Sequence, residues 1–345
     1  MASGVGGLPT SFLARLRGGA GPRVAILAEY DALPEIGHGC GHNLIAAAGV
    51  GAGLALARAA AAHRTVLPGE VLVVGTPAEE TIGGKGPMVD AGVFEGVDAA
   101  MMAHGGSEWR VFTDSLACAS IRVTFLGRES HAVAWPEKGV NALDALIQLF
   151  VAVEMMRKRL GGDVHIPGVI LEGGVRPNIV PARAVGAFSL RAPTKTRLQE
   201  VRAEVERAVR AIAEAVGCRA GIEQTDHTYD EMITNVALAR RYGEYLASMG
   251  IETVDTPRQH RGSLDMGNVS RAVPSLHAFM AVAGADTPVH TAAFAQATVT
   301  PAAGEALMIT VKALALTAHD VLADPDLLQE VRREFEAARR GGDTR

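Results

Sequence analysis

Several short apolar runs occur along this chain, and each of the first three is followed by charged or metal-ligating side chains. The runs Val24–Leu27, Glu70–Gly75 and Ala99–Ala103 predict buried strands of the parallel type, because nearly every residue in them is apolar. The small apolar residues of Leu44–Ala62 predict a helix directly after the first strand and its loop. This order predicts an α/β domain whose chemistry lies at the carboxyl ends of its strands.

The pattern changes near Leu116, where apolar and polar residues begin to alternate. The alternation predicts half-exposed strands separated by two amphipathic helices, in the order β-α-β-β-α-β of a ferredoxin-like module. We therefore expect an α/β fold with a mixed central sheet flanked by helices, interrupted by an inserted α+β dimerisation or lid domain. The predicted domains are residues 1–115, 116–228 and 229–345. The predicted elements of the insert are strands at 119–126, 165–171, 184–191 and 219–224, and helices at 141–160 and 194–216.

The two ends of the chain give weaker patterns. Residues 1–22 are Gly-rich and predict a loose lead-in, and the charged tail Arg332–Arg345 predicts a frayed end. After the insert we expect a helix near Ile233–Met249, a strand at His277–Val282 and a helix at Ala302–Val321.

Composition narrows the function classes. The 345 residues carry a net charge of −5, which argues against a nucleic-acid binder that relies on a basic surface. No apolar run reaches the roughly 18 uncharged residues that a membrane span needs, and three scattered cysteines are too few for a disulfide framework. We expect a cytoplasmic protein with no membrane or nucleic-acid partner.

Metal-compatible side chains recur at the predicted strand ends. Cys40 and His42 follow the first strand, the adjacent carboxylates Glu79 and Glu80 follow the second, and His104 ends the third. Each signal alone is weak, because lone cysteines, histidines and acidic pairs are usually structural or solvated. Together with His290 in a late loop they supply five ligands and a neighbouring base, which suits two metal ions that activate a water.

Nucleophilic catalysis is the main rival chemistry. His131 follows Ser130, but no GxSxG elbow occurs in the chain, and neither does a GxxxxGK[ST] phosphate loop. Cys40 and His42 are too close along the chain for the usual nucleophile–base arrangement. A thiol hydrolase that uses Cys40 nevertheless stays open as an alternative.

An ordered set of motifs resembles a known family. The chain resembles the dinuclear metallopeptidases that include aminoacylase and carboxypeptidase G, and within them the Cys-Gly-His amidohydrolase branch of aminobenzoyl-glutamate hydrolase, auxin-conjugate hydrolases and dipeptidase-like members. The resemblance extends over about residues 21–322. The motifs are EYDALPEIGHGCGHNL, GTPAEETIGGKGPMVDAGVF, MMAHGG, RESHAVAWPEKGVNALDAL, GGVRPNIVPARAV, GSLDMGNV and PVHTAAF.

The resemblance implies a role for each matching residue. Glu79 would be the general base and proton shuttle, and Asp31 would orient a metal-binding imidazole. His131 would reach the active site of a partner subunit in a homodimer and stabilise the oxyanion. Two divalent ions, zinc or manganese with cobalt also open, would be held by Cys40, His42, Glu80, His104 and His290.

Other positions are less defined. Asn178 and Arg191 would hold the substrate carboxylate, whereas His38, Asp265 and Asn268 match no assigned role. Only Met1–Arg23 precede the first strand, where the resemblance implies several dozen residues, so we expect a late start codon or a natural truncation. The predicted reaction is metal-dependent hydrolysis of the amide bond of N-acyl amino acids or dipeptides. The non-enzymatic alternative is a catalytically impaired homologue that acts as a binding or scaffold protein.

Overall fold

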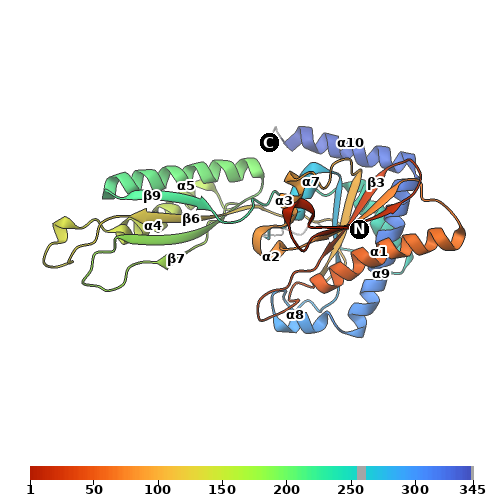
Figure 1. Ribbon diagram of the computed structural model, residues 1–345, viewed down its shortest axis with the longest axis horizontal. Coiled ribbons are helices and arrows are strands. Elements are labelled where there is room, and N and C mark those ends of the chain that lie inside the picture. Colours follow the sequence, from red (N-terminus) through yellow and green to blue (C-terminus); the bar gives the residue numbers. More distant parts are fainter. Residues whose placement is uncertain (255–261, 343–345) are drawn as a thin grey trace. The chain divides into compact units, whose positions relative to one another are not determined.

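The computed structural model describes residues 1–254 and 262–342, with side chains up to Arg340. The chain forms two compact units, which are unit 1 (Met1–Ser115 and Met232–Arg345) and unit 2 (Leu116–Glu231) (Figure 1). The second boundary falls three residues after the one predicted from the sequence. Each unit has its own sheet and its own hydrophobic core.

Unit 1 is built on a six-stranded sheet in the order β1-β2-β4-β3-β5-β10. The apolar runs form parallel neighbours, namely β4 (Glu70–Thr76), β3 (Arg23–Glu29), β5 (Ala99–Gly106) and β10 (Ser275–Ala281). At the other edge, β2 (Phe12–Arg17) is antiparallel to β4, and β1 (Ala2–Ser3) is antiparallel to β2. The mixed central sheet expected from the sequence is therefore confirmed.

Helices cover both faces of this sheet, because alternate strand residues point to opposite sides. Val24 and Ile26 of β3 belong to the core cluster on the side of α1, α6, α9 and α10, whereas Ala25 and Leu27 belong to the cluster on the side of α3 and α7. The helices are α1 (His42–His63), α6 (Val236–Ser248), α9 (Pro301–Ala323), α10 (Pro325–Gly342), α3 (Lys85–Asp90) and α7 (Met266–Ala272), with short α2 (Glu79–Ile82) and α8 (Ala292–Ala297).

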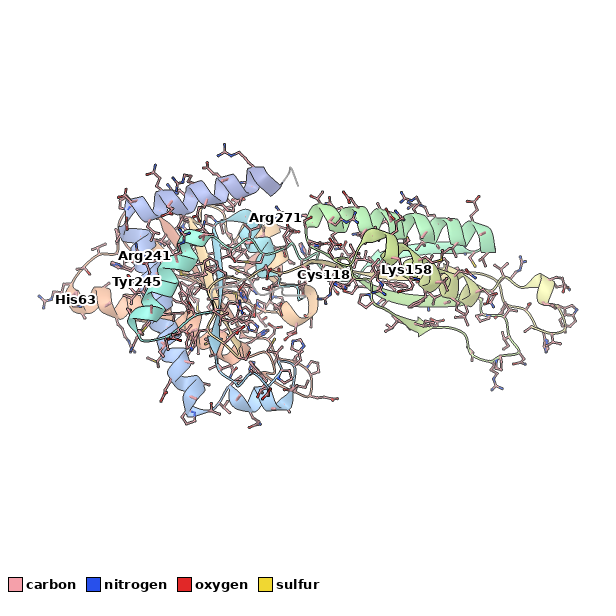
Figure 2. The ribbon with its side chains drawn as sticks, turned by 180° about the vertical axis from the view of Figure 1, so that it is seen from behind. His63, Cys118, Lys158, Arg241, Tyr245 and Arg271 are labelled. Atoms are coloured by element: carbon pink, nitrogen blue, oxygen red, sulfur yellow. The ribbon has the colours of Figure 1, made fainter. Side chains whose placement is uncertain are left out.

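The helices α1 and α9 are long and apolar enough to cross a membrane by length and composition. Here they pack against each other and the sheet, as core helices do. A Cβ atom on Gly49 of α1 would lie 2.5 Å from the carbonyl oxygen of Leu27, so this glycine permits the close approach of helix and strand. Tyr245 of α6 (labelled in Figure 2) donates a 2.5 Å hydrogen bond to Asp320 of α9, which links these two helices.

Two sequence predictions for the chain ends were wrong. Residues 1–22 are not a loose lead-in, since they form β1, a 3-10 helix at Val5–Gly7 and β2, and Leu13 is buried against the sheet. The tail is not frayed over its described part, because α10 continues through it to Gly342 and Arg332 forms an ion pair with Asp98. Residues 343–345 of that prediction lie outside the described residues.

Unit 2 is an antiparallel sheet in the order β7-β8-β6-β9 with two helices against it. The chain order β-α-β-β-α-β agrees with the predicted ferredoxin-like module. Side-chain caps start both helices, because Asn141 accepts from the Leu143 amide and Thr194 from the Arg197 amide. The elements are β6 (Ala117–Leu126), a 3-10 helix at Pro136–Lys138, α4 (Ala142–Leu160), β7 (Gly168–Glu172), β8 (Arg183–Ala192), α5 (Lys195–Val216) and β9 (Arg219–Gln224).

Candidate metal centre

The parallel strands of unit 1 bring the predicted ligands to one edge of the sheet. Cys40 and His42 come from the loop after β3 and the start of α1, and Glu80 comes from α2 after β4. His104 lies inside β5, and His290 follows β10. Because parallel neighbours end at the same edge, residues up to 250 positions apart in the sequence become neighbours.

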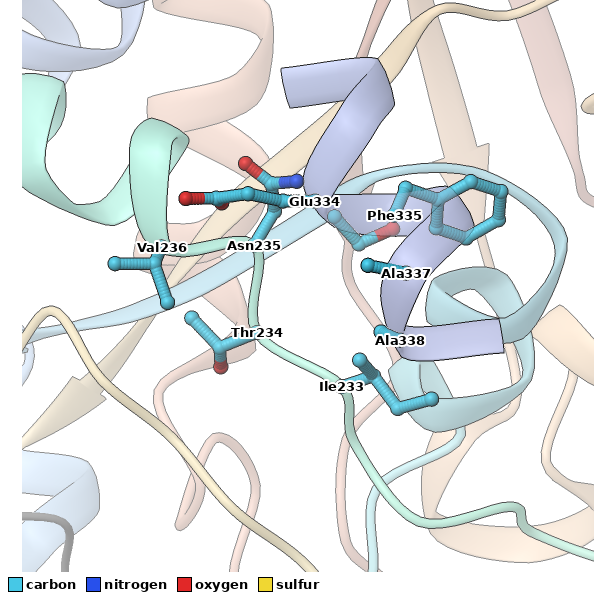
Figure 3. Close-up of a pocket in the computed structure, with 9 residues that line it drawn as sticks. Ile233, Thr234, Asn235, Val236, Glu334, Phe335, Ala337 and Ala338 are labelled. Carbon is cyan, nitrogen blue, oxygen red and sulfur yellow. The ribbon is translucent and has the colours of Figure 1, made fainter. Parts of the chain in front are cut away.

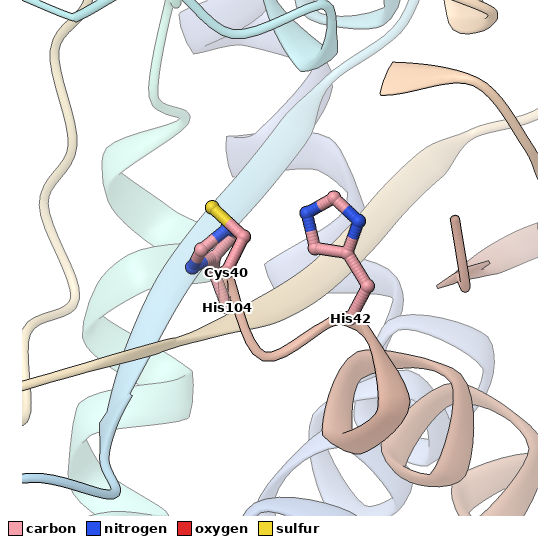
Figure 4. A group of neighbouring side chains, drawn as sticks. All are labelled: Cys40, His42 and His104. Atoms are coloured by element: carbon pink, nitrogen blue, oxygen red, sulfur yellow. The ribbon is translucent and has the colours of Figure 1, made fainter. Parts of the chain in front are cut away.

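These five side chains form two groups that share Cys40. The ligand atoms of Cys40, His42 and His104 lie within 4.8 Å of one another, and so do those of Cys40, Glu80 and His290. Figure 4 shows the Cys40 thiol beside the His104 ring, with the His42 ring across from them. In the second group, the His290 Nε2 atom lies 3.2 Å from the Cys40 sulfur and 3.6 Å from Glu80 Oε1.

The donor set fits divalent metal ions. His42 turns its Nδ1 atom to the Asp31 carbonyl oxygen at 2.9 Å, which leaves Nε2 for a cation. Within the described residues, His42 Nε2 and Glu80 Oε1 are buried side-chain atoms that have no hydrogen-bond partner. Buried polar atoms are rarely left in this state, so metal ions bound at the two ligand groups would explain both. Thiolate, imidazole and carboxylate together suit a borderline-soft ion such as zinc.

The loops that present these ligands adopt unusual backbone conformations. Gly41, between Cys40 and His42, has φ +80°, and the non-glycine residues Ala78 and His290 have φ +66° and +64°. Ala78 directly precedes Glu79 and Glu80. Such left-handed residues cost free energy and cluster at functional sites, where they aim side chains that regular structure would turn away.

Burial and neighbouring charges set the protonation of the site. Burial, followed by the neighbouring carboxylates Glu80 and Glu79, raises the pKa of the Cys40 thiol, so the metal-free thiol is a poor nucleophile. Burial and nearby His42 lower the pKa of His104 to about 4, which keeps this imidazole neutral and able to ligate. Burial, then the charges of Glu29 and Asp265, raise the pKa of Glu79 well above its usual range, as expected of a general base poised to accept a proton.

A buried charge cluster beside the ligands was missed in the sequence. The Lys85 ammonium pairs with Glu29 and lies 2.7 Å from Asp265 Oδ1, and all three side chains are about 1–2% exposed. The second oxygen of Glu29 lies 3.1 Å from His42 Nε2. The available signal was Glu29, a carboxylate that directly follows the apolar run of β3. Asp265, which had no assigned role, is a partner of Lys85.

Asp31 contacts two of the predicted metal ligands, His42 and Glu80. Its Oδ1 atom is 3.3 Å from His42 Nδ1, and its Oδ2 atom accepts a 3.0 Å hydrogen bond from the Glu80 amide. Burial would raise the pKa of Asp31, but the hydrogen bonds from His42 and from the Glu80 and Glu79 amides outweigh it and lower the pKa to about 2. One carboxylate thus ties two ligand loops together.

The lowered pKa of Asp31 predicts a pH dependence of stability. Its folded-state value of about 2 lies below the ordinary 3.8, so the stabilisation is present above about pH 4 and is lost as the pH falls towards 2. We expect the metal-free Asp31→Asn variant to be less stable than the wild type at pH 6, with the difference shrinking towards pH 2. Urea unfolding across this range measures it. The exposed Asp286→Asn variant serves as control, and a difference independent of pH would contradict the prediction.

The remaining predicted residues lie in unit 2. His131 and Asn178 are neighbours there, because the Ala132 amide donates to the Asn178 carbonyl at 3.0 Å and His131 forms a β-bridge with Ile179. Arg191 lies at the opposite end of β8, where it faces Cys118 of β6 in the register. The two predicted carboxylate-binding residues are thus apart within this unit. His38 and Asn268 belong to none of the ligand groups found among the described residues.

A separate pocket of about 280 Å³ lies in unit 1 between α10 and the segment that leads into α6 (Figure 3). Its lining is mostly small or apolar, and the Glu334 carboxylate on its wall accepts from the Ala237 amide at the start of α6. This carboxylate therefore caps α6. None of the residues that line the pocket belongs to the metal-compatible groups found among the described residues.

Comparisons with known proteins agree with this site. A family model described as a peptidase dimerisation domain matches residues 117–216. The chain is 40% identical to the mouse (Mus musculus) Xaa-Arg dipeptidase over 338 residues, which cover 95% of this chain and 78% of that protein. It is 26% identical to one subunit of the Escherichia coli p-aminobenzoyl-glutamate hydrolase, covering 96% and 84% of the two chains.

The fold agrees with solved structures. A dinuclear metal-binding peptidase of the M20 family from Bacillus subtilis superposes with a TM-score of 0.67 at 21% identity, covering 92% of this chain and 86% of that one. An aminobenzoyl-glutamate utilization protein from Klebsiella pneumoniae gives a TM-score of 0.68 at 23% identity, covering 89% and 74%. The resemblance inferred from the sequence motifs is confirmed. From the identity shared along nearly its whole length, and from the ligand cluster at its sheet edge, this chain belongs to the M20 peptidase family and is a metal-dependent amide hydrolase.

Proposed function

We propose that this hydrolase cleaves dipeptides and N-acyl amino acids with two divalent ions per chain. The observation that carries the proposal is the pair of ligand groups, Cys40/His42/His104 and Cys40/Glu80/His290, which share the Cys40 sulfur at one edge of the sheet. Zinc suits the thiolate and imidazole donors best, and manganese or cobalt are the other candidates. When bound, the ions supply Lewis-acid activation of a water and of the substrate carbonyl.

The residues of the chain supply the remaining steps. Glu79, adjacent to the ligand Glu80, accepts the proton of the attacking water and later donates it to the leaving amine. Its raised pKa supports this double role, because a carboxylate with a raised pKa takes up a proton more readily and can hold it for the leaving amine. Asp31 holds His42 in the tautomer that leaves Nε2 free.

The first substrates to test are dipeptides with a C-terminal arginine. This choice is supported by the 40% identity to the mouse Xaa-Arg dipeptidase, a greater identity than that to the aminobenzoyl-glutamate hydrolase. We would compare Xaa-Arg, Xaa-Lys and Xaa-Asp dipeptides with N-acetyl amino acids, with and without a chelator. Chelator-sensitive turnover of dipeptides, restored by added metal, supports the proposal. Turnover that survives complete metal removal would refute it and would reopen the Cys40 thiol alternative.

We propose further that the protein works as a homodimer in the cytoplasm, with His131 completing the partner subunit's site as an oxyanion donor. Asn178, beside His131, and Arg191 would bind substrate carboxylates. Two exposed apolar surfaces of unit 2 support a dimer. Edge strand β7 exposes about half of Val169, Ile170 and Leu171, and α4 exposes an apolar stripe of Ile147, Val151 and Met155. An unpaired edge strand beside exposed apolar residues is the usual template for pairing with a second chain.

The dimer proposal predicts the effect of charge on these surfaces. We expect the double variant Val151→Glu/Ile170→Glu to be a monomer, because two buried and unpaired carboxylates would oppose association. Light scattering should give the 36.0 kDa mass of one chain for the variant and about twice that mass for the wild type. Val299→Glu, at a 72% exposed position of unit 1, is the matched control. A monomeric wild type would contradict the proposal.

A further inference from the structure

The side chain of Glu29 has two oxygens in different surroundings. Oε2 pairs with the Lys85 ammonium, which is also held by Asp265. Oε1 is buried, has no hydrogen-bond partner within the described residues, and lies 3.1 Å from His42 Nε2. Glu29 thus directs one oxygen to the Lys85 ammonium, and it directs the other, which has no hydrogen-bond partner, to the predicted ligand His42.

The contact between Glu29 and His42 joins two atoms that can each bind a metal ion. The Asp31 carbonyl at 2.9 Å and its Oδ1 at 3.3 Å lie against His42 Nδ1, so the ring proton belongs on Nδ1 and Nε2 offers a lone pair. Glu29 Oε1 also offers a lone pair. Two such donor atoms 3.1 Å apart, with neither side chain more than about 2% exposed, are placed to share one cation, which is a proton in the metal-free protein and a divalent ion when metal is bound.

The separation itself fits a shared ion. Donors bound at about 2.05 Å in a tetrahedral shell lie about 3.3 Å apart, close to the 3.1 Å between Oε1 and Nε2. Glu29, His42 and Glu79 also form a group whose ligand atoms lie within 4.8 Å of one another. We propose that Glu29 is a further metal ligand, which binds through Oε1 to the same ion as His42, while Lys85 and Asp265 fix its orientation from behind. This inference rests on the dinuclear site of the proposed function.

The proposal predicts a change in metal affinity that can be measured without turnover. Glu29→Gln keeps the shape of the side chain but removes the anionic donor, so we expect it to weaken the binding of zinc at one site at least about 100-fold. Competitive titration of the full-length protein against a chromophoric chelator gives the affinity of each site. The cobalt-loaded protein gives a second readout, because loss of a ligand should change the intensity and position of its visible absorption bands.

Glu95→Gln is the matched control, since it makes the same chemical change at an exposed position outside the ligand groups. We expect its zinc affinity to stay within about threefold of the wild type. If Glu29→Gln does not fold, Glu29→Asp keeps the charge beside Lys85 and withdraws the oxygen by one methylene, and it should also bind one ion more weakly. Unchanged affinity and an unchanged cobalt spectrum in Glu29→Gln would overturn the inference. A wild type that binds no metal would instead refute the proposed function, so the two failures are distinguishable.

Discussion

Replacing Glu79 with Gln should lower kcat by about 10²–10⁴-fold while both metal ions stay bound. The substitution removes the group that accepts the proton of the water and returns it to the leaving amine, and it changes neither the size of the side chain nor the ligand Glu80. KM should change little, because Glu79 acts on the reacting water and the loss falls on the chemical step. Steady-state kinetics with a dipeptide substrate, combined with metal analysis of the same preparation, measures both parts.

Two further variants make the Glu79 result specific. Glu80→Gln should also lose activity, but by losing metal, because Glu80 Oε1 is one of the buried atoms that face the ion. Glu95→Gln, at an exposed position away from the ligand groups, should retain wild-type activity. Near-normal turnover in metal-loaded Glu79→Gln would remove Glu79 from the mechanism, and Asp31 or Glu29 would then have to be considered as the base.

The sequence was sufficient to predict those site residues that directly follow an apolar strand. The runs that became β3, β4 and β5 are almost wholly apolar, and parallel strands must bring their carboxyl ends to one edge. The ligands after those strands could therefore be grouped before the structure was known. His290 was the exception, since its distance of 250 residues from Cys40 could be bridged only by family resemblance.

The sequence was insufficient for contacts between residues far apart in the chain, and for a helix whose charged residues obscure its apolar positions. The strand β2 spans only six residues after a Gly-rich stretch, and Leu13 is the one buried residue in it, so its pairing with β4 had no clear signal. From Arg332 onwards the sequence of α10 is mostly charged and has few apolar residues, which suggested a frayed tail. Lys85 meets Glu29 and Asp265 across 56 and 180 positions, and single side chains give no periodicity to detect such contacts.

Replacing Lys85 with Met should lower the free energy of unfolding by about 3–5 kcal/mol, the cost of breaking a buried ion pair by removing one partner. The carboxylates of Glu29 and Asp265 would remain buried with no ammonium between them. The carboxylate of Glu79 also helps to raise the pKa of Lys85, so it too would lose a favourable interaction. The loss should appear in urea unfolding of the metal-free protein near neutral pH. Lys312→Met, at an exposed position of α9, should change the stability by less than about 0.5 kcal/mol.

The mechanism of this loss can be separated from simple loss of packing. If uncompensated charge is the cause, neutralising both partners in the triple variant Glu29→Gln/Lys85→Met/Asp265→Asn should recover much of the stability, because a buried ion cluster contributes less than the cost of leaving half of it unpaired. A triple variant no more stable than Lys85→Met alone would show instead that the lysine stem fills space that methionine cannot. Because the triple variant also lacks the Glu29 carboxylate, its metal affinity should stay low even where its stability recovers, which would separate the part of the cluster in folding from the part of Glu29 in metal binding.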